Sequence, residues 1–442
     1  MRHKILLTPF LLLWLAASAN AQTVRFRTNL GDIDVTLTPA VAPATVANFL
    51  SYLNKGAYTG TIFHRSVSGF IIQGGGFQLT GVTPFATAQD PAVKNEFNVS
   101  NTRGTIAMAK LGSDANSATN QWFFNLGDNS ANLDAQNGGF TVFGKVVNAA
   151  GLAVMDRISA QPVYNLGSPF DAIPLTGYKG TGGVLAGNFI TVSSLVVVPA
   201  ISTGGVQSAA SFVSSSNSGI APGEFLALYG QNMGPATLTS LALDINGAVN
   251  TTLAGTRVFF DGTPAPVVYT SAGQLSVIVP YNVAGKDSVR VVVEYQGTQA
   301  TGLQLPVSAS NPAIFTLNSS GTGDGAIVRL DASVVSSKSP AAVGDTLILF
   351  GEGQGVTAPP LADGAIVGSM LPMPTGTTTL LIDGQAVPTL YAGGAPSLVN
   401  GVLQVNFKVP QLTPGTHQIQ LRVDDRTNPA RTSPSGVTLQ TK

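Results

Sequence analysis

The chain has 442 residues, with 22 Lys and Arg against 22 Asp and Glu, three histidines and no cysteine. This balance lacks the basic excess expected of a protein that binds nucleic acid or an acidic membrane surface, and the missing cysteines exclude disulfides and thiol chemistry. With 50 glycines and 27 prolines, the composition favours short strands joined by tight turns, in a mainly β chain of several domains.

Residues 1–21 have the pattern of an export signal. Residues 1–4 are basic, residues 5–17 are almost continuously apolar, and Ala19-Asn20-Ala21 is a small-x-small cleavage motif, so we expect the mature chain to begin at Gln22. The apolar run is shorter than the roughly 20 residues of a membrane span. No later stretch has that character, so we expect no span in the mature chain, with an uncleaved N-terminal anchor as the alternative.

Alternating and helical patterns predict the first elements. Residues 23–37 alternate about an Asn-Leu-Gly-Asp turn and predict a β-hairpin. Residues 43–56 predict a helix, with a proline at its start, an i, i+3, i+4, i+7 apolar face and a closing glycine. After short apolar runs broken by glycine, residues 149–158 predict a weaker second helix. A closing strand over 189–198 ends this part of the chain.

After Pro199 the charges thin out, and an internal repeat appears. Residues 202–218 are rich in Ser, Gly and Asn and are interpreted as a linker merging into a first strand. Three pairs of segments then match in the same order, as duplicated units do: 222–230 with 343–351, 258–262 with 380–384, and 274–280 with 404–410. Two β-sandwich repeats are predicted, over 199–310 with its linker and over 311–442.

The histidines exclude several enzyme classes. His3 lies in the export signal, and His64 and His417 lie in distant segments, so a His-rich zinc site is not expected. No Gly-x-Ser-x-Gly elbow accompanies either histidine, and no complete phosphate-binding glycine motif occurs between a strand and a helix. We therefore expect neither a metal nor another cofactor.

Five blocks of residues remain, and they combine apolar side chains with one arginine. They occupy residues 63–75, 101–110, 116–125, 133–134 and 140–146. These blocks, in this order, resemble the cyclophilin family of peptidyl-prolyl cis-trans isomerases, in particular its bacterial periplasmic branch. The resemblance extends over 23–198, and with the export signal removed it implies an isomerase domain at 22–198. It implies a closed eight-stranded antiparallel barrel with two helices.

The resemblance also implies the site. Its catalytic residues are Arg65 and Gln73. Its proline pocket is formed by four apolar residues, Phe70, Ile71, Phe123 and Leu133. Two further substrate-binding residues, Ala109 and Lys110, pair with the bound peptide through their backbone. Ile71 replaces the methionine that is usual in the family.

These residue types suit an isomerisation without covalent chemistry. Amide resonance opposes rotation about a peptide bond with a barrier of about 18–20 kcal/mol. An enzyme lowers it by binding the twisted amide better than the planar one. On the family model, Arg65 stabilises the lone pair of the prolyl nitrogen, and Gln73 holds a substrate carbonyl.

Some residues of the blocks are interpreted differently. His64 is expected to be structural, and alternation is expected to direct Trp122 and Phe124 into the core. Two positions depart from the family: Asn132 stands where an aromatic wall is usual, and Phe140 where His or Tyr is common. We expect these changes to weaken some ligands but not to abolish catalysis.

An apolar segment follows each of the Asp-Gly pairs at 261–262 and 383–384. Through these segments the tail repeats resemble immunoglobulin-like domains of the IPT/TIG type. We expect spacers or docking modules. The chain as a whole is interpreted as a periplasmic or extracellular isomerase acting on proline-containing segments of unfolded or exported proteins. The alternatives are a non-catalytic binder of such segments, or an envelope or adhesion protein whose tail carries the main role.

Overall fold

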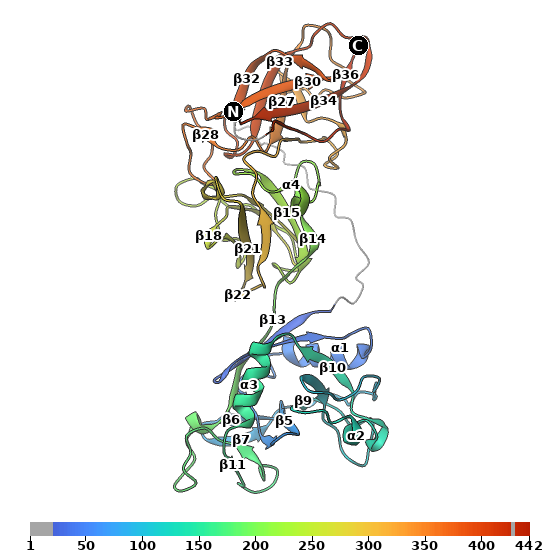
Figure 1. The fold of residues 1–442 in the computed structure, drawn as a ribbon, viewed down its shortest axis with the longest axis vertical. Coiled ribbons are helices and arrows are strands. Elements are labelled where there is room, and N and C mark those ends of the chain that lie inside the picture. Colours follow the sequence, from blue (N-terminus) through green and yellow to red (C-terminus); the bar gives the residue numbers. More distant parts are fainter. Residues whose placement is uncertain (1–20, 426–428) are drawn as a thin grey trace. The chain divides into compact units, whose positions relative to one another are not determined.

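The structure, a computed structural model, describes residues 21–425 and 429–442. The expected export signal lies outside the described residues except for Ala21. The described chain divides into two compact units, the N-terminal unit up to Val198 and the C-terminal unit from Pro199 (Figure 1). None of the described helices has the length and apolar character needed to span a membrane.

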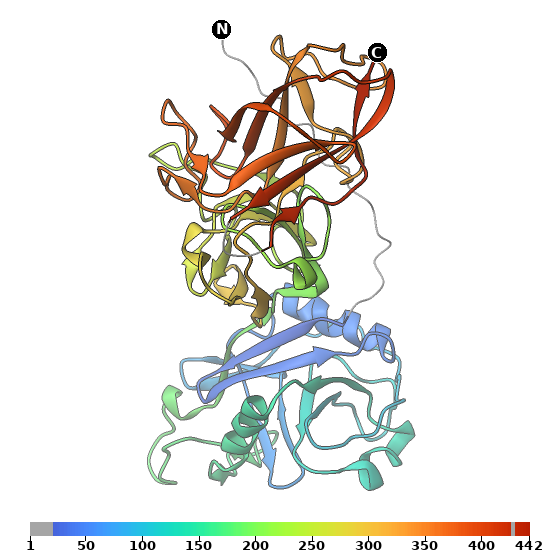
Figure 2. The same cartoon turned by 45° about the horizontal axis from the view of Figure 1, so that its top comes forward.

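The N-terminal unit is built on one antiparallel sheet of eleven strands, which is curled rather than flat (Figure 2). In spatial order the strands are β4 (Arg65–Val67), β5 (Ile71–Gly74), β9 (Trp122–Asn125), β8 (Thr105–Met108), β10 (Val142–Val146), β2 (Gly31–Leu37), β1 (Thr23–Thr28), β13 (Thr191–Val197), β3 (Thr61–Ile62), β6 (Phe77–Thr80) and β7 (Thr83–Ala86). The predicted hairpin and closing strand are β1–β2 and β13. The hydrogen-bonded path through the described strands is open at β4 and β7, so closure into an eight-stranded barrel is not confirmed.

Both predicted helices are present, as α1 (Pro43–Asn54) and α3 (Ala149–Ser159). Pro43 occupies the first turn of α1, where a missing N–H costs nothing, and Asn148 caps α3 by accepting a hydrogen bond from the Gly151 amide at 2.9 Å. Shorter elements complete the unit: α2 (Ser130–Leu133), the 3-10 turns η1 (Gln136–Gly138) and η2 (Ala186–Asn188), and the pair β11 (Val163–Tyr164) and β12 (Ile173–Pro174).

An aromatic cluster forms the main core of this unit. Trp122 and Phe124 are completely buried, and their rings lie 5.0 and 5.4 Å from the ring of Phe26 in edge-on arrangements. Such edge-on pairs are favoured by the ring quadrupoles. The expectation that Trp122 and Phe124 belong to the core is confirmed, and it follows that the residue between them, Phe123, faces the opposite side of β9.

The C-terminal unit begins with a β-sandwich of two sheets. One sheet contains β14 (Ala200–Ser208), β15 (Phe225–Gln231), β20 (Gln274–Ile278), β19 (Val267–Thr270) and β16 (Thr239–Ser240). The other contains β18 (Thr263–Pro264), β17 (Thr256–Phe260), β21 (Ser288–Tyr295), β22 (Thr298–Gln299) and β23 (Leu303–Pro306). Short helical turns at α4 (Ser215–Ser218) and η3 (Tyr281–Val283) connect strands.

The linker interpretation of residues 202–218 is wrong. Residues up to Ser208 belong to β14, which pairs with β15 at its two ends, over 200–201 and 206–208, with an irregularity between them. Val206 and Ser208 are completely buried on this strand. Ser, Thr, Gly and Gln occupy most of the other positions, and a strand with so few apolar side chains lacks the alternation that sequence reasoning depends on.

A second sandwich follows. One sheet contains β24 (Ala313–Ile314), β27 (Thr346–Glu352), β33 (Leu403–Lys408), β32 (Thr389–Gly394) and β26 (Ile327–Arg329). The other contains β25 (Gly323–Asp324), β36 (Val437–Thr441), β34 (Gly415–Asp424), β30 (Thr377–Ile382), β31 (Gln385–Val387) and β35 (Arg431–Thr432). A small hairpin pairs β28 (Thr357–Ala358) with β29 (Met373–Pro374).

The two sandwiches repeat details as well as strands. Asp261 and Asp383 both follow the matched strand with positive φ angles of 47° and 48°. Each carboxylate accepts a hydrogen bond from a strand amide at 2.9 Å, that of Arg290 in the first sandwich and that of Gln418 in the second. The internal repeat read from the sequence therefore corresponds to a repeated turn in three dimensions.

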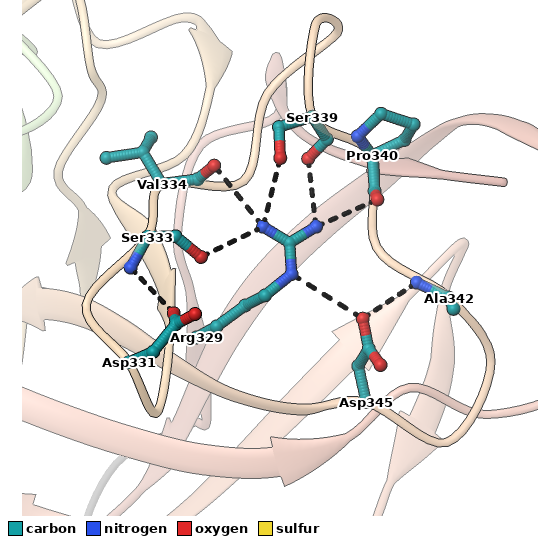
Figure 3. Close-up of polar contacts among 8 residues, drawn as sticks. All are labelled: Arg329, Asp331, Ser333, Val334, Ser339, Pro340, Ala342 and Asp345. Atoms are coloured by element: carbon teal, nitrogen blue, oxygen red, sulfur yellow. Dashed lines mark hydrogen bonds and ion pairs between the residues drawn. The ribbon is translucent and has the colours of Figure 1, made fainter.

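One arginine holds a long loop of the second sandwich (Figure 3). Arg329 Nη2 donates to the carbonyls of Ser339 and Pro340 at 3.1 and 2.8 Å, and Arg329 Nε lies 3.6 Å from an Asp345 carboxylate oxygen. That oxygen also accepts a hydrogen bond from the Ala342 amide at 2.9 Å. Since the guanidinium has partners on several sides, we interpret Arg329 as a structural residue of this loop.

Candidate active site

A cavity of about 300 Å³ opens on the N-terminal unit, on the face of the sheet away from the aromatic core. All eight site residues implied by the sequence line it. Three further residues complete the lining, so that the whole set is Arg65, Phe70, Ile71, Gln73, Ala109, Lys110, Phe123, Asn132, Leu133, Gln136 and Phe140. The structure thus brings together residues from five separate blocks.

Strand pairing places the two polar residues side by side. Arg65 on β4 lies directly opposite Gln73 on β5, and Arg65 Nη1 donates to Gln73 Oε1 at 3.4 Å. Gln73 Nε2 in turn donates to Gln121 Oε1 at 2.9 Å. Gln121 thereby orients the Gln73 amide. Sequence reasoning assigned Gln121 no role, although it stands two residues before Phe123, on the same side of an extended chain.

An apolar floor lies below these polar groups. Ile71, Phe123 and Leu133 are buried within a small cluster of their own, and Phe70 and Phe140 pack against it half-buried. The rings of Phe123 and Phe140 meet edge-on with centroids 5.7 Å apart. Such a floor has the size and character to take a small apolar ring such as a prolyl side chain.

Buried amides connect the floor to its supports. Asn129 Nδ2 donates to the Phe70 carbonyl and to Asn125 Oδ1, both at 2.8 Å. Asn125 Nδ2 donates to Asn101 Oδ1 at 3.1 Å, and the Asn101 backbone amide and side chain reach one Asp134 oxygen at 3.0 and 2.9 Å. This chain of hydrogen bonds joins segments far apart in sequence, which is why sequence reasoning did not find it.

The opposite wall is polar and comes from α2 and the loop after it. Asn132 and Gln136 are hydrogen-bonded to each other through their side-chain amides. Gln136 was not anticipated, because a loop residue four positions beyond Asn132 carries no pattern of its own. Asn132 lines the cavity. It stands at the position where the family resemblance leads us to expect an aromatic side chain.

His64 lies beside the site and does not line the cavity. Its side chain is buried and packs edge-on against Phe77, with ring centroids 4.9 Å apart. Burial, with the nearby charge of Arg65, lowers the pKa of His64 to about 4. The imidazole is therefore neutral near pH 7, in agreement with the structural role expected for it.

The lining residues suit binding and polarisation rather than bond cleavage. The cavity is lined by one guanidinium, one ammonium, three side-chain amides and apolar groups, with no carboxylate, hydroxyl or imidazole among the lining residues. Over the described ranges, no three His, Asp or Glu side chains are grouped so as to hold a metal ion.

The ammonium of Lys110 is partly withdrawn from water. Desolvation lowers the pKa of Lys110, and the negative charge of Asp114 opposes that effect.

Comparison with known families gives two matches. Residues 23–179 match the model described as cyclophilin type peptidyl-prolyl cis-trans isomerase/CLD. Residues 208–308 match the IPT/TIG domain. The first match includes every residue of the cavity, and the second covers most of the first sandwich.

Curated relatives are peptidyl-prolyl cis-trans isomerases. Peptidyl-prolyl cis-trans isomerase A of Dickeya dadantii is 43% identical over 162 residues, covering 36% of this chain and 81% of the relative. An isomerase of Acinetobacter baylyi is 43% identical over 159 residues, with 35% and 81% covered. Isomerase B of Escherichia coli is 45% identical over 141 residues, with 30% and 82% covered. A solved Cryptosporidium parvum cyclophilin aligns at 24% identity and a TM-score of 0.30, over 40% of this chain and 98% of its own.

Proposed function

Because the chain belongs, through its N-terminal unit, to the cyclophilin type peptidyl-prolyl cis-trans isomerases, we infer that the cavity accelerates rotation about X-Pro peptide bonds. The observation that carries this is the arrangement of Arg65 opposite Gln73 above an apolar floor. The enzyme is an isomerase that needs no covalent intermediate, and its substrates are proline-containing peptide segments.

We assign roles to the cavity residues as follows. The prolyl ring rests on Phe123 and Leu133, in a floor too apolar to compete for hydrogen bonds. Arg65, permanently protonated, aims a donor at the prolyl nitrogen as conjugation is lost, and Gln73 holds the neighbouring carbonyl. Exclusion of water by the bound peptide strengthens both interactions. Every 1.36 kcal/mol or so removed from the rotation barrier raises the rate tenfold.

The extended backbone of the substrate is assigned to the segment after β8. Ala109 and Lys110 follow the last residue of that strand, Met108, and both line the cavity. An extended peptide can pair with backbone groups there as an added strand, while its proline enters the pocket. This arrangement would fix the direction of the peptide across the site.

The first experiment is a protease-coupled assay on an Ala-Pro peptide. We expect Arg65→Ala to lower kcat/KM about 100-fold, the effect typical of losing one donor to a transition state. Lys145→Ala serves as the control. Lys145 is an exposed residue on β10 of the same unit, and its substitution removes one positive charge, as Arg65→Ala does. Equal rates for wild type and Arg65→Ala would overturn the catalytic assignment.

A non-catalytic binder is the second candidate, and Asn132 favours it. An amide in place of an aromatic wall reduces the apolar area available to a bound ligand. The same assay separates the two functions when combined with peptide binding. Saturable binding of the Ala-Pro peptide by a wild type that gives no acceleration would establish the binder instead.

We further propose that the enzyme acts on exported proteins in the periplasm or outside the cell. The basic start, short apolar run and Ala19-Asn20-Ala21 motif support this. The two sandwiches are proposed as spacers or docking modules on that side of the membrane. Mass spectrometry of the protein from fractionated cells is expected to find Gln22 as the first residue, and an intact Met1 in the cytosolic fraction would contradict export.

A further inference from the structure

The Lys110 side chain connects two walls of the cavity. Lys110 stands just beyond β8, and its Nζ donates to the carbonyls of Asn137 and Gly139, both at 2.6 Å. The same Nζ lies 4.8 Å from the centroid of the Phe140 ring. An ammonium carries three donors, so two of them are used on backbone oxygens of one loop. Lys110 therefore links the end of β8 to this loop, whereas a solvated surface lysine would donate to water.

The loop that Lys110 reaches has an unusual backbone. Asn137, Gly138 and Gly139 all have positive φ angles, of 46°, 76° and 76°. For a residue with a side chain, such as Asn137, this region is sparsely populated and costs energy unless the surroundings hold it. Asn95 Nδ2 also holds the loop, donating to Gly138 O at 2.7 Å and to Gly139 O at 3.1 Å. Of these two residues that hold the loop, Lys110 lines the cavity and Asn95 does not.

The position of this loop determines the shape of the pocket. Gln136 and Phe140, at its two ends, both line the cavity. The Phe140 amide donates to the Leu133 carbonyl at 3.2 Å, and the Phe140 ring meets Phe123 edge-on. A displacement of the loop would therefore move a wall against which the prolyl ring packs. Arg65 and Gln73 stand on β4 and β5 and are held by each other and by Gln121.

We propose that the Lys110 side chain is a positioning residue that fixes the 136–140 loop as a wall of the proline pocket, and so sets substrate affinity rather than the rate of rotation. The proposal rests on the isomerase function assigned above. It adds a side-chain role to a residue whose backbone alone was expected to contact the peptide. The proposal also assigns catalysis and affinity to different places. Arg65 and Gln73 on β4 and β5 accelerate rotation, and the contact of Lys110 with the loop determines how tightly the peptide binds.

The test is a kinetic comparison of full-length variants. Lys110→Met keeps an unbranched, slightly shorter side chain and removes the ammonium with its two hydrogen bonds to the loop. We expect KM to rise about fivefold while kcat stays within twofold, as for the loss of a partly exposed charged hydrogen bond. Lys110→Arg can still donate to both carbonyls and is expected to keep KM within twofold of wild type. Lys145→Met removes the same charge from an exposed strand position and is expected to change neither constant.

Two further measurements exclude simpler explanations. Titration of an Ala-Pro peptide by calorimetry reports affinity directly, because KM equals the dissociation constant only when rotation is slow relative to release. Amide hydrogen exchange at residues 136–140 is expected to speed up in Lys110→Met and not in Lys145→Met. A melting temperature within about 2 °C of wild type establishes that the variant is folded; if it is not, Lys110→Gln replaces it.

The outcomes separate this proposal from the function on which it rests. Wild type as slow as Arg65→Ala would overturn the isomerase function. An active wild type with Lys110→Met unchanged in KM, or reduced in kcat alone, would overturn only the role of Lys110. Failure of Lys110→Arg to restore affinity would also overturn it, since the two carbonyl contacts would then not be what matters.

Discussion

Asn129 shows how a single buried amide supports the pocket. The side chain is buried, and both of its hydrogen bonds go to groups that have little access to water, the Phe70 carbonyl and Asn125 Oδ1. Removing the donor would leave Asn125 Oδ1 without its hydrogen bond, while the Phe70 carbonyl would keep the one it accepts from the Leu126 amide at 2.9 Å. A buried polar group deprived of its partner costs about 1–3 kcal/mol.

Asn129→Ala is therefore expected to lower the free energy of unfolding by about 1–3 kcal/mol. It is also expected to lower kcat/KM, because Phe70 loses one of the hydrogen bonds that hold its backbone beside the cavity. Urea unfolding followed by fluorescence checks the first expectation, and Trp122 in the nearby core provides the signal. Asn98→Ala, at an exposed position, is the control and is expected to change stability by less than about 0.5 kcal/mol. Equal stabilities of the two variants would contradict this account.

At the level of single residues, the sequence predicted which side chains gather but not how they are held. The eight implied residues could be located because five blocks in order matched a family pattern. Gln121 and the Asn101–Asn125–Asn129 chain could not, since they depend on partners tens of residues away. Gln136 could not either, because its contact with Asn132 leaves no pattern in the sequence. Amides that donate to backbone carbonyls also leave no periodic signal in a sequence.

At the level of elements, prediction succeeded where the pattern was long enough. The hairpin β1–β2 and the helices α1 and α3 extend over six or more residues each, so that alternation or helical period was visible. Strands of two residues, such as β3 and β16, are too short to alternate and exist only through their partners. The sheet consequently has eleven strands on an open path where the family pattern implied eight in a closed barrel.

The repeated sandwiches illustrate the same difference. The matched segments correspond to β15 and β27, β17 and β30, and β20 and β33. An acidic residue precedes both strands of the first pair, Glu224 before β15 and Asp345 before β27. Each accepts a hydrogen bond from an amide three residues earlier. Repetition was visible in sequence because turns and buried strands need particular residues, whereas β14 has few apolar residues and was missed.

At the level of the whole molecule, two buried carboxylates lie inside the C-terminal unit. Glu224 and Glu352 are both fully buried. Glu224 accepts from Asn311 Nδ2 at 2.8 Å, and Glu352 accepts from Ser208 Oγ at 2.8 Å and from the Phe225 amide at 3.0 Å. Burial raises the pKa of Glu352 to about 7, and burial together with the charge of Glu352 raises the pKa of Glu224, with Arg431 opposing.

The stability of the C-terminal unit is therefore expected to depend on pH. A carboxyl whose pKa is higher in the folded state stabilises that state fully below its unfolded pKa, near 4.5. The contribution is lost as pH rises through about 7. Calorimetry of the full chain is expected to show a lower melting temperature at pH 8.5 than at pH 5. Glu352→Gln cannot ionise and should weaken that dependence, and an unchanged slope in this variant would contradict the assignment.

The position of Glu352 has a consequence for how the tail unfolds. The residue ends β27 of the second sandwich, yet its hydrogen-bond donors, Ser208, Ala210 and Phe225, all belong to the first. Unfolding either sandwich would leave a buried group of the other without its partner. In repeat proteins such shared interfaces couple neighbouring units. We therefore expect the two sandwiches to unfold as one cooperative unit, in which the loss of either repeat lowers the stability of the other.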